Sequence, residues 1–204
     1  MKLAARLLLA AACYAIKIPA AETYTYWIQT CSTEVAKQSH CEPSDTELAR
    51  WALDAWRRVA PDSLTFAPAS ENRARLRVYW ASERLQLYGE ARPITVDGKP
   101  GAAIFVNPDT AQLGPEIREA AAHDKLLRDS IVYLTCVHES GHALGLHHTA
   151  EFADIMYYFG FGGDIVEYFG RYRRVLTARE DIRKQNGVST HDERQLRVLL
   201  AVPQ

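Results

Sequence analysis

Three histidines and a glutamate gather in residues 138–148, which read HESGHALGLHH. On a helix, residues four apart project from one face, so His138 and His142 can both ligate a single metal ion. Glu139 lies within the same arc of about 100°, from which its carboxylate can reach a metal-bound water without being a ligand itself. The segment therefore predicts two metal ligands and a general base on one helical turn.

A third ligand is expected just beyond this helix. Gly145 permits the left-handed conformation that ends a helix, after which the chain can bring His148 back to the metal. Three neutral imidazoles leave the fourth tetrahedral position open to water, which is the catalytic pattern of zinc ligation. A rearrangement that uses His147 instead stays open, as does a histidine-rich helix end that binds no metal.

The pattern His-Glu-x-x-His-x-x-Gly-x-x-His is the signature of the metzincin zinc peptidases. Met156, in the run DIMY, resembles the methionine turn that lies beneath the metal in this family, although core filling is an alternative role. It follows His148 by only eight residues. This short gap and the run GHALGL resemble the matrixins. The resemblance implies an α+β fold: a zincin-like catalytic domain with a twisted mixed sheet, two long helices above the cleft, and a small C-terminal subdomain with the methionine turn and a final helix.

Tyr158 departs from the matrixin pattern, because matrixins usually carry proline two residues after the methionine. In astacins and serralysins, a tyrosine at this offset coordinates zinc or stabilises the oxyanion of the tetrahedral intermediate. Tyr158 is therefore a candidate transition-state residue, and a buried structural tyrosine is the alternative.

The resemblance implies a zinc-dependent endopeptidase with one catalytic Zn²⁺ held by His138, His142 and His148. The metal is expected to lower the pKa of its water towards about 7 and to polarise the scissile carbonyl. Glu139 is expected to take the water proton and deliver it to the leaving amine. The rival function is an exported, non-catalytic zinc protein that binds a peptide or partner. Glu139 argues against it, because a structural site gains nothing from a base beside an open metal position.

The expected substrate is a peptide or protein in extended conformation. It would pair with residues 87–90, on a strand that resembles the sheet edge above the metzincin cleft. A plain solvent-facing edge is the alternative for this strand. We expect a monomer, and the net charge of −1 offers no sign of nucleic-acid binding.

Residues 1–21 read as an export signal, with a short basic region followed by the apolar run 7–12. Residues 9–13 also resemble an imperfect lipobox, in which Cys13 would carry a lipid anchor to the membrane. We therefore expect a secreted or periplasmic protein, with a peptidase domain over 22–187 and a C-terminal tail over 188–204.

The cysteines support an oxidising compartment. Cys31 and Cys41 flank a short polar loop, and a disulfide between them would stabilise the fold by roughly 2.5–3 kcal/mol. Cys136 is expected to be a buried, inert thiol on the helix side away from the ligands. Asp97 and Asp109 are isolated, so a calcium site near either is possible but unsupported. His40, His123 and His191 are scattered and do not support a second zinc site.

Hydrophobic periodicity and turn residues predict the remaining elements. Strands are expected at 23–30, 64–67, 75–81, 85–92 and 102–107, with Asp97-Gly98 in the loop before the last. Helices are expected after the capping pair Ser44/Glu47 up to Pro61, from about Asp124 into the histidine motif, and after the capping pair Thr177/Glu180 up to Asn186-Gly187. The run 176–182 resembles the start of the terminal matrixin helix.

Two further segments have open interpretations. Residues 159–169, rich in glycine and aromatic side chains, form either a wall of the substrate pocket or a surface loop. Arg171, Arg173 and Arg174 form either a solvated face or a site for an acidic substrate.

Overall fold

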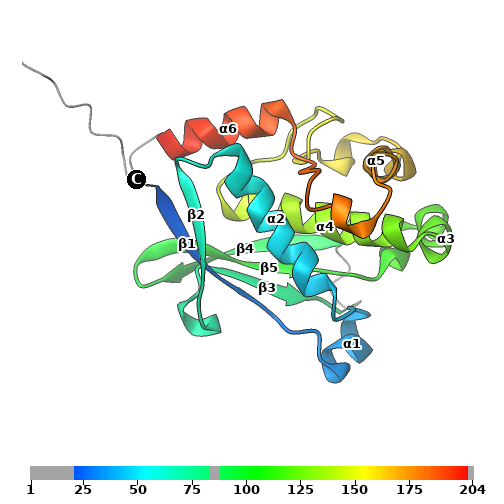
Figure 1. The fold of residues 1–204 in the computed structure, drawn as a ribbon, viewed down its shortest axis with the longest axis horizontal. Coiled ribbons are helices and arrows are strands. Elements are labelled where there is room, and N and C mark those ends of the chain that lie inside the picture. Colours follow the sequence, from blue (N-terminus) through cyan, green and yellow to red (C-terminus); the bar gives the residue numbers. More distant parts are fainter. Residues whose placement is uncertain (1–20, 83–87, 202–204) are drawn as a thin grey trace, which may run out of the picture.

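The computed structural model describes residues 21–82 and 88–201, which form a five-stranded mixed sheet with helices against one face (Figure 1). Its strands are β1 (Glu22–Ile28), β2 (Leu64–Pro68), β3 (Leu76–Trp80), β4 (Gly89–Val96) and β5 (Lys99–Val106). They are ordered β2-β1-β3-β5-β4, and only β4 is antiparallel to its neighbour. The predicted α+β fold with a mixed sheet is confirmed. The proposed export signal up to Ala20, including Cys13, lies outside the described residues.

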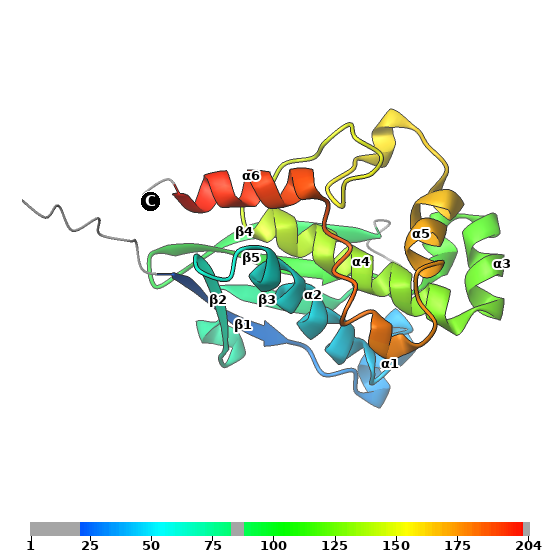
Figure 2. The same cartoon turned by 45° about the horizontal axis from the view of Figure 1, so that its top comes forward.

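Two long helices, α2 (Asp45–Val59) and α4 (Lys125–Ala143), pack against each other and against the sheet (Figure 2). Trp56 of α2 is fully buried, and its indole N–H donates to the Val137 carbonyl at 2.9 Å and to Ser140 Oγ at 3.1 Å. These bonds fix α2 against the turn of α4 that carries the histidines. Of the described helices, none is both long and apolar enough to cross a membrane.

The hairpin between β4 and β5 is tighter than the sequence predicted. Asp97 and Gly98 have φ angles of 50° and 74° and make a two-residue turn. The prediction of a longer loop was wrong, because two left-handed residues let β4 continue to Val96 and β5 begin at Lys99. Leu85 and Leu87, assigned to this strand by the sequence, lie outside the described residues.

The helix α4 begins where the sequence predicted, but neither of the two predicted capping pairs forms. The Asp124 carboxylate accepts from the Leu127 N–H at 3.0 Å and begins α4 as expected. The Ser44 side chain makes no cap bond, and Glu47 instead pairs with Arg179 at 2.8 Å. After Thr177 the cap is Asp181 rather than Glu180, and only the short 3-10 turn η5 (Arg179–Asp181) follows. Both predicted capping pairs were therefore wrong.

The shorter elements complete the chain around the two long helices. They are α1 (Thr33–Ser39), η1 (Glu71–Arg73), η3 (Thr110–Leu113), α3 (Pro115–His123), η4 (Phe159–Phe161), α5 (Ile165–Arg173) and α6 (Thr190–Ala201). The final helix is α6, in the segment that the sequence assigned to a tail, and not residues 177–187. A capping box begins it, since the Asp192 N–H donates to Ser189 Oγ and the Ser189 N–H donates to the Asp192 carboxylate. Leu196 anchors the helix in the core.

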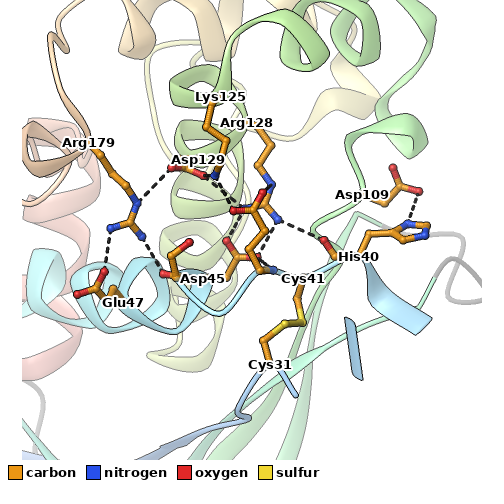
Figure 3. A network of polar contacts seen from close by, with 12 residues as sticks. Cys31, His40, Cys41, Asp45, Glu47, Asp109, Lys125, Arg128, Asp129 and Arg179 are labelled. Carbon is orange, nitrogen blue, oxygen red and sulfur yellow. Dashed lines mark hydrogen bonds and ion pairs between the residues drawn. A yellow bond between two sulfur atoms is a disulfide. The ribbon is translucent and has the colours of Figure 1, made fainter. Parts of the chain in front are cut away.

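A buried cluster of charges joins α2, α4 and η5 (Figure 3). Asp45 and Asp129 are almost completely buried carboxylates. Arg128 donates to both oxygens of Asp45, and Lys125 and Arg179 contact Asp129 at 2.5 Å and 3.1 Å. The cluster therefore clamps the first half of α4 to its neighbours.

The predicted disulfide between Cys31 and Cys41 is confirmed, and it lies beside this cluster (Figure 3). It closes the loop that contains α1. Cys136 is a free, buried thiol, as expected.

Substitution of Asp45 by asparagine should destabilise the fold strongly, because the buried Arg128 would lose the carboxylate to which it makes two hydrogen bonds. The expected loss is about 3–5 kcal/mol in the free energy of unfolding, measured by urea denaturation. The exposed pair of Glu34 and Lys37, 3.9 Å apart, provides a control: Glu34→Gln should cost less than about 1 kcal/mol. Equal losses in the two variants would contradict a structural role for the buried cluster.

Candidate metal centre

Three imidazole rings converge at the C-terminal end of α4. The Nε2 atom of His148 lies 3.0 Å from that of His142 and 3.3 Å from that of His138. His138 Nδ1 is 2.6 Å from the Ile155 carbonyl, and His142 Nδ1 is 2.9 Å from the Leu146 carbonyl. Because a carbonyl only accepts, these two Nδ1 atoms carry the protons and their Nε2 atoms present lone pairs to the centre.

The donor set fits a zinc ion. Tetrahedral nitrogen ligands at 2.0–2.1 Å from zinc are about 3.3 Å apart, close to the separations of His148 Nε2 from its two neighbours. Because His138 and His142 donate through Nδ1, each presents an Nε2 lone pair rather than a proton, and both lone pairs are available to a metal ion. Burial lowers the pKa of His138 to about 3, helped by repulsion from His142, and burial also lowers the pKa of His142 and His148. The neutral form that binds metal is therefore favoured at all three.

Local backbone geometry explains how His148 reaches the other two. The helix α4 carries His138 and His142 on one face, and Gly145 follows with a φ of 98°. This conformation suits glycine and turns the chain back. His148, and not its neighbour His147, joins the only group of three potential metal ligands within the described ranges.

Met156 packs directly beneath the histidine turn, with 1% of its surface exposed. A Cβ added to Gly141 would lie 2.5 Å from Met156 Sδ and 2.9 Å from the Trp56 ring. Gly141 therefore creates the space into which the methionine and the tryptophan fit. This geometry agrees with a methionine turn below a metal site.

Glu139 faces the edge strand β4. Its side chain is buried, and a Cβ added to Gly89 would lie 2.4 Å from Glu139 Oε1. Burial, together with a smaller effect from the charge of Glu90, raises the pKa of Glu139 to about 8. A carboxylate so destabilised holds a proton readily, and a nearby cation would favour its charged form.

A cleft of about 690 Å³ runs past the histidines and Glu139. One side is formed by residues 88–91 at the start of β4, which is the edge strand of the described sheet. The cleft is also lined by residues 145–148 and 157–159, and Ile165 and Phe169 of α5 add an apolar wall. Of the two interpretations of residues 159–169, the structure supports the pocket wall. Tyr158 also lines the cleft and is 48% exposed, so it is not a buried tyrosine.

The remaining candidates lie apart from the cleft. Arg171 donates to the Phe152 carbonyl, Arg173 pairs with Asp124 and Arg174 pairs with Glu167. Because the fold itself engages each guanidinium and none lines the cleft, the site for an acidic substrate lacks structural support.

The two aspartates considered for calcium also have other roles. Asp97 forms the β4–β5 turn, whereas Asp109 accepts from the Ala111 N–H and contacts His40. His123 bonds to the Glu119 carbonyl, and His191 pairs with Asp154. No group of ligands for a second metal forms among residues 21–82 and 88–201.

The support that α6 gives to this centre was not predicted from the sequence. The buried Asp192 carboxylate accepts from the Ile155 N–H at 2.8 Å, and the Ile155 carbonyl orients His138. Asp154 accepts from Ser189 Oγ at 2.7 Å and from His191 Nδ1 at 2.6 Å. The pattern Ser-x-x-Asp before an apolar run was the available signal for this helix start.

The contact between Asp154 and His191 makes stability depend on pH. The hydrogen bond to Asp154 raises the pKa of His191. The charged imidazole therefore contributes fully to stability below the unfolded pKa of about 6.5, and this contribution is lost as the pH rises through the folded pKa. Burial opposes ionisation of Asp154, but hydrogen bonds from Ser189 and His191 outweigh it and lower the pKa. The ionised Asp154 therefore contributes to stability above about pH 3.9, and this contribution is lost as the pH falls through the folded pKa of Asp154.

The stability difference between the wild type and His191→Gln should therefore be largest between about pH 4 and 6.5 and should shrink at higher pH. Denaturation with urea at several pH values between 5 and 9 measures it. A difference that stays constant over this range would contradict the charged pair. His123→Gln, which changes an exposed histidine bonded only to its own helix, serves as the control.

The comparisons with known proteins agree with this geometry. The family model described as Matrixin matches residues 20–161, which is more than half of the chain and includes all three histidines, Glu139 and Met156. Among curated proteins, no sequence matches this one.

Proposed function

The chain belongs to the matrixin family of zinc metallopeptidases, and from this premise we propose that it is an endopeptidase in which Glu139 is the general base. One observation carries the proposal. The three Nε2 atoms converge within a cleft whose wall also contains the buried Glu139 carboxylate. A site for metal alone would not need a basic group with a raised pKa beside it.

His138, His142 and His148 would hold the zinc ion. When bound, zinc supplies a Lewis acid that lowers the pKa of water and polarises a carbonyl group. Glu139 accepts the proton of the attacking water and returns it to the nitrogen of the leaving amine. Its burial keeps bulk water from competing for that proton.

The substrate would lie extended along β4. This strand pairs with β5 on one side only, and its residues 89–91 line the cleft. An extended peptide can therefore add to the sheet through main-chain hydrogen bonds. Leu87, which the sequence placed in this contact, lies outside the described residues. The apolar wall of Ile165 and Phe169 favours an apolar substrate side chain next to the metal.

We also propose that the protein acts outside the cytoplasm, after removal of an export signal. The disulfide between Cys31 and Cys41 supports an oxidising compartment. We propose a monomeric peptidase that begins near residue 22. Its domain would include α6, because Leu196 of this helix packs in the core. The proposed mechanism does not depend on the oxyanion role that the sequence suggested for the Tyr158 hydroxyl.

Glu139→Gln should lower kcat by about 10²–10⁴-fold while one zinc ion remains bound, because the base is lost and the ligands are kept. The assay uses the exported form of the protein with a quenched-fluorescence peptide library, with and without a zinc chelator, and the metal content of each sample. Glu116→Gln, on the exposed face of α3, is the matched control and should cleave like the wild type.

Two outcomes would contradict the proposal. If Glu139→Gln retained full activity, another group would be the base. If the zinc-loaded wild type cleaved no peptide in the library, the cleft would instead belong to a non-catalytic binding module.

A further inference from the structure

The three metal-facing imidazoles do not have equal support. Backbone carbonyls orient His138 and His142 through their Nδ1 atoms. In the described part of the chain, no carbonyl or carboxylate accepts from His148 Nδ1, and the His148 side chain is the exposed member of the group. Because metal-ligating histidines are usually fixed by a partner on the second nitrogen, His148 needs another means of orientation.

Tyr158 stacks on this ring. The centroids of the His148 and Tyr158 rings are 4.7 Å apart, and their planes are inclined by 24°. Tyr158 also meets Phe161 edge-on, with centroids 5.6 Å apart. Both tyrosine contacts fall in the range of favourable aromatic pairs.

The backbone of Gly160 lies against the ring of Tyr158. A Cβ added to Gly160 would lie 2.0 Å from Cε1 and 2.4 Å from Cζ of the Tyr158 ring. The ring therefore lies against the backbone of residue 160 in the space that a side chain there would occupy. This contact restricts the ring while 48% of the tyrosine remains exposed.

The backbone holds the two stacked residues beside each other. The Thr149 N–H donates to the Met156 carbonyl at 2.8 Å, and the Tyr158 N–H donates to the Thr149 carbonyl at 3.1 Å. These bonds form a parallel bridge between Thr149 and Tyr157, one residue away from each ring. The pairing joins the chain after His148 to the chain after Met156 and leaves the two rings in contact.

From these contacts we infer that the ring of Tyr158, and not its hydroxyl, serves the metal centre, as a positioning residue that orients His148. The inference rests on the proposed zinc site. The Nε2 lone pair lies in the plane of the imidazole, whereas the phenol ring lies beside that plane. Among the described residues no hydrogen bond holds the exposed Tyr158 hydroxyl, so nothing aims it at the reacting carbonyl.

A ring that positions His148 and a hydroxyl that donates to the oxyanion predict opposite results when the hydroxyl is removed. With a positioning ring, Tyr158→Phe keeps the stack, and its zinc dissociation constant should stay within about threefold of wild type. Tyr158→Leu loses the aromatic face and should bind zinc about tenfold or more weakly, as expected for loss of an orienting partner. Competition with a chromophoric chelator measures both constants.

Gly160→Ala tests the contact between the backbone of residue 160 and the Tyr158 ring, because the added methyl group would displace the ring. We expect weaker zinc binding than in wild type, in the same direction as Tyr158→Leu. Gly170→Ala is the matched control, since a Cβ there meets only the end of Arg174 at 3.4 Å, and its zinc affinity should equal that of wild type. The visible spectrum of the Co²⁺-loaded proteins reports ligand geometry directly and should change in Tyr158→Leu but not in Tyr158→Phe.

Three results would overturn the inference. One is a fall in kcat of about 10²–10³-fold in Tyr158→Phe with unchanged zinc affinity, which is the result for an oxyanion donor. Another is zinc affinity within twofold of wild type in Tyr158→Leu. The third is a zinc affinity in His142→Ala equal to that of the wild type. The proposed zinc site would then be wrong, and the inference with it. Thermal unfolding of the metal-free variants shows that each one folds.

Discussion

The structure depends on bringing three imidazole lone pairs to one point. Neutral rings with lone pairs directed at each other repel, so this arrangement needs rigid support until a cation offsets the repulsion. The support is unequal. Two of the rings are fixed by the carbonyls of Ile155 and Leu146, whereas the third is exposed and stacks on Tyr158. The first two rings also share one helical turn, whose position Trp56 and Met156 fix from below.

The rest of the fold holds that turn from both ends of α4. At its start, the buried charges of Asp45, Arg128 and Asp129 tie the helix to α2, and Arg179 extends the tie to the chain that follows α5. At its other end, Asp192 of α6 holds Ile155, whose carbonyl orients a histidine. Residues far apart in the sequence therefore restrict the same few side chains. This rigidity suits a site that must keep metal ligands within a few tenths of an ångström.

The sequence predicted what depends on local spacing. His138, Glu139 and His142 follow from helical periodicity, and Gly145 from the need to end the helix, which its φ of 98° bears out. What depends on distant partners was missed. Ser44 and Glu47 have the spacing of a capping box, but Arg179 takes the glutamate from 132 residues away. The final helix was placed too early, because the pair Thr177/Glu180 resembles a helix start as closely as the true pair Ser189/Asp192 does. The stack of Tyr158 on His148 depends on the backbone bridge between Thr149 and Tyr157, which no local sequence pattern predicts.

X-ray absorption at the zinc edge, on wild type and His148→Ala, measures the central arrangement most directly. In the wild type we expect four light ligands, of which three are imidazole nitrogens at about 2.0–2.1 Å from zinc. In His148→Ala we expect only two imidazole nitrogens. A sulfur ligand, or the same number of imidazoles in both proteins, would contradict the convergence of His138, His142 and His148 on one metal ion.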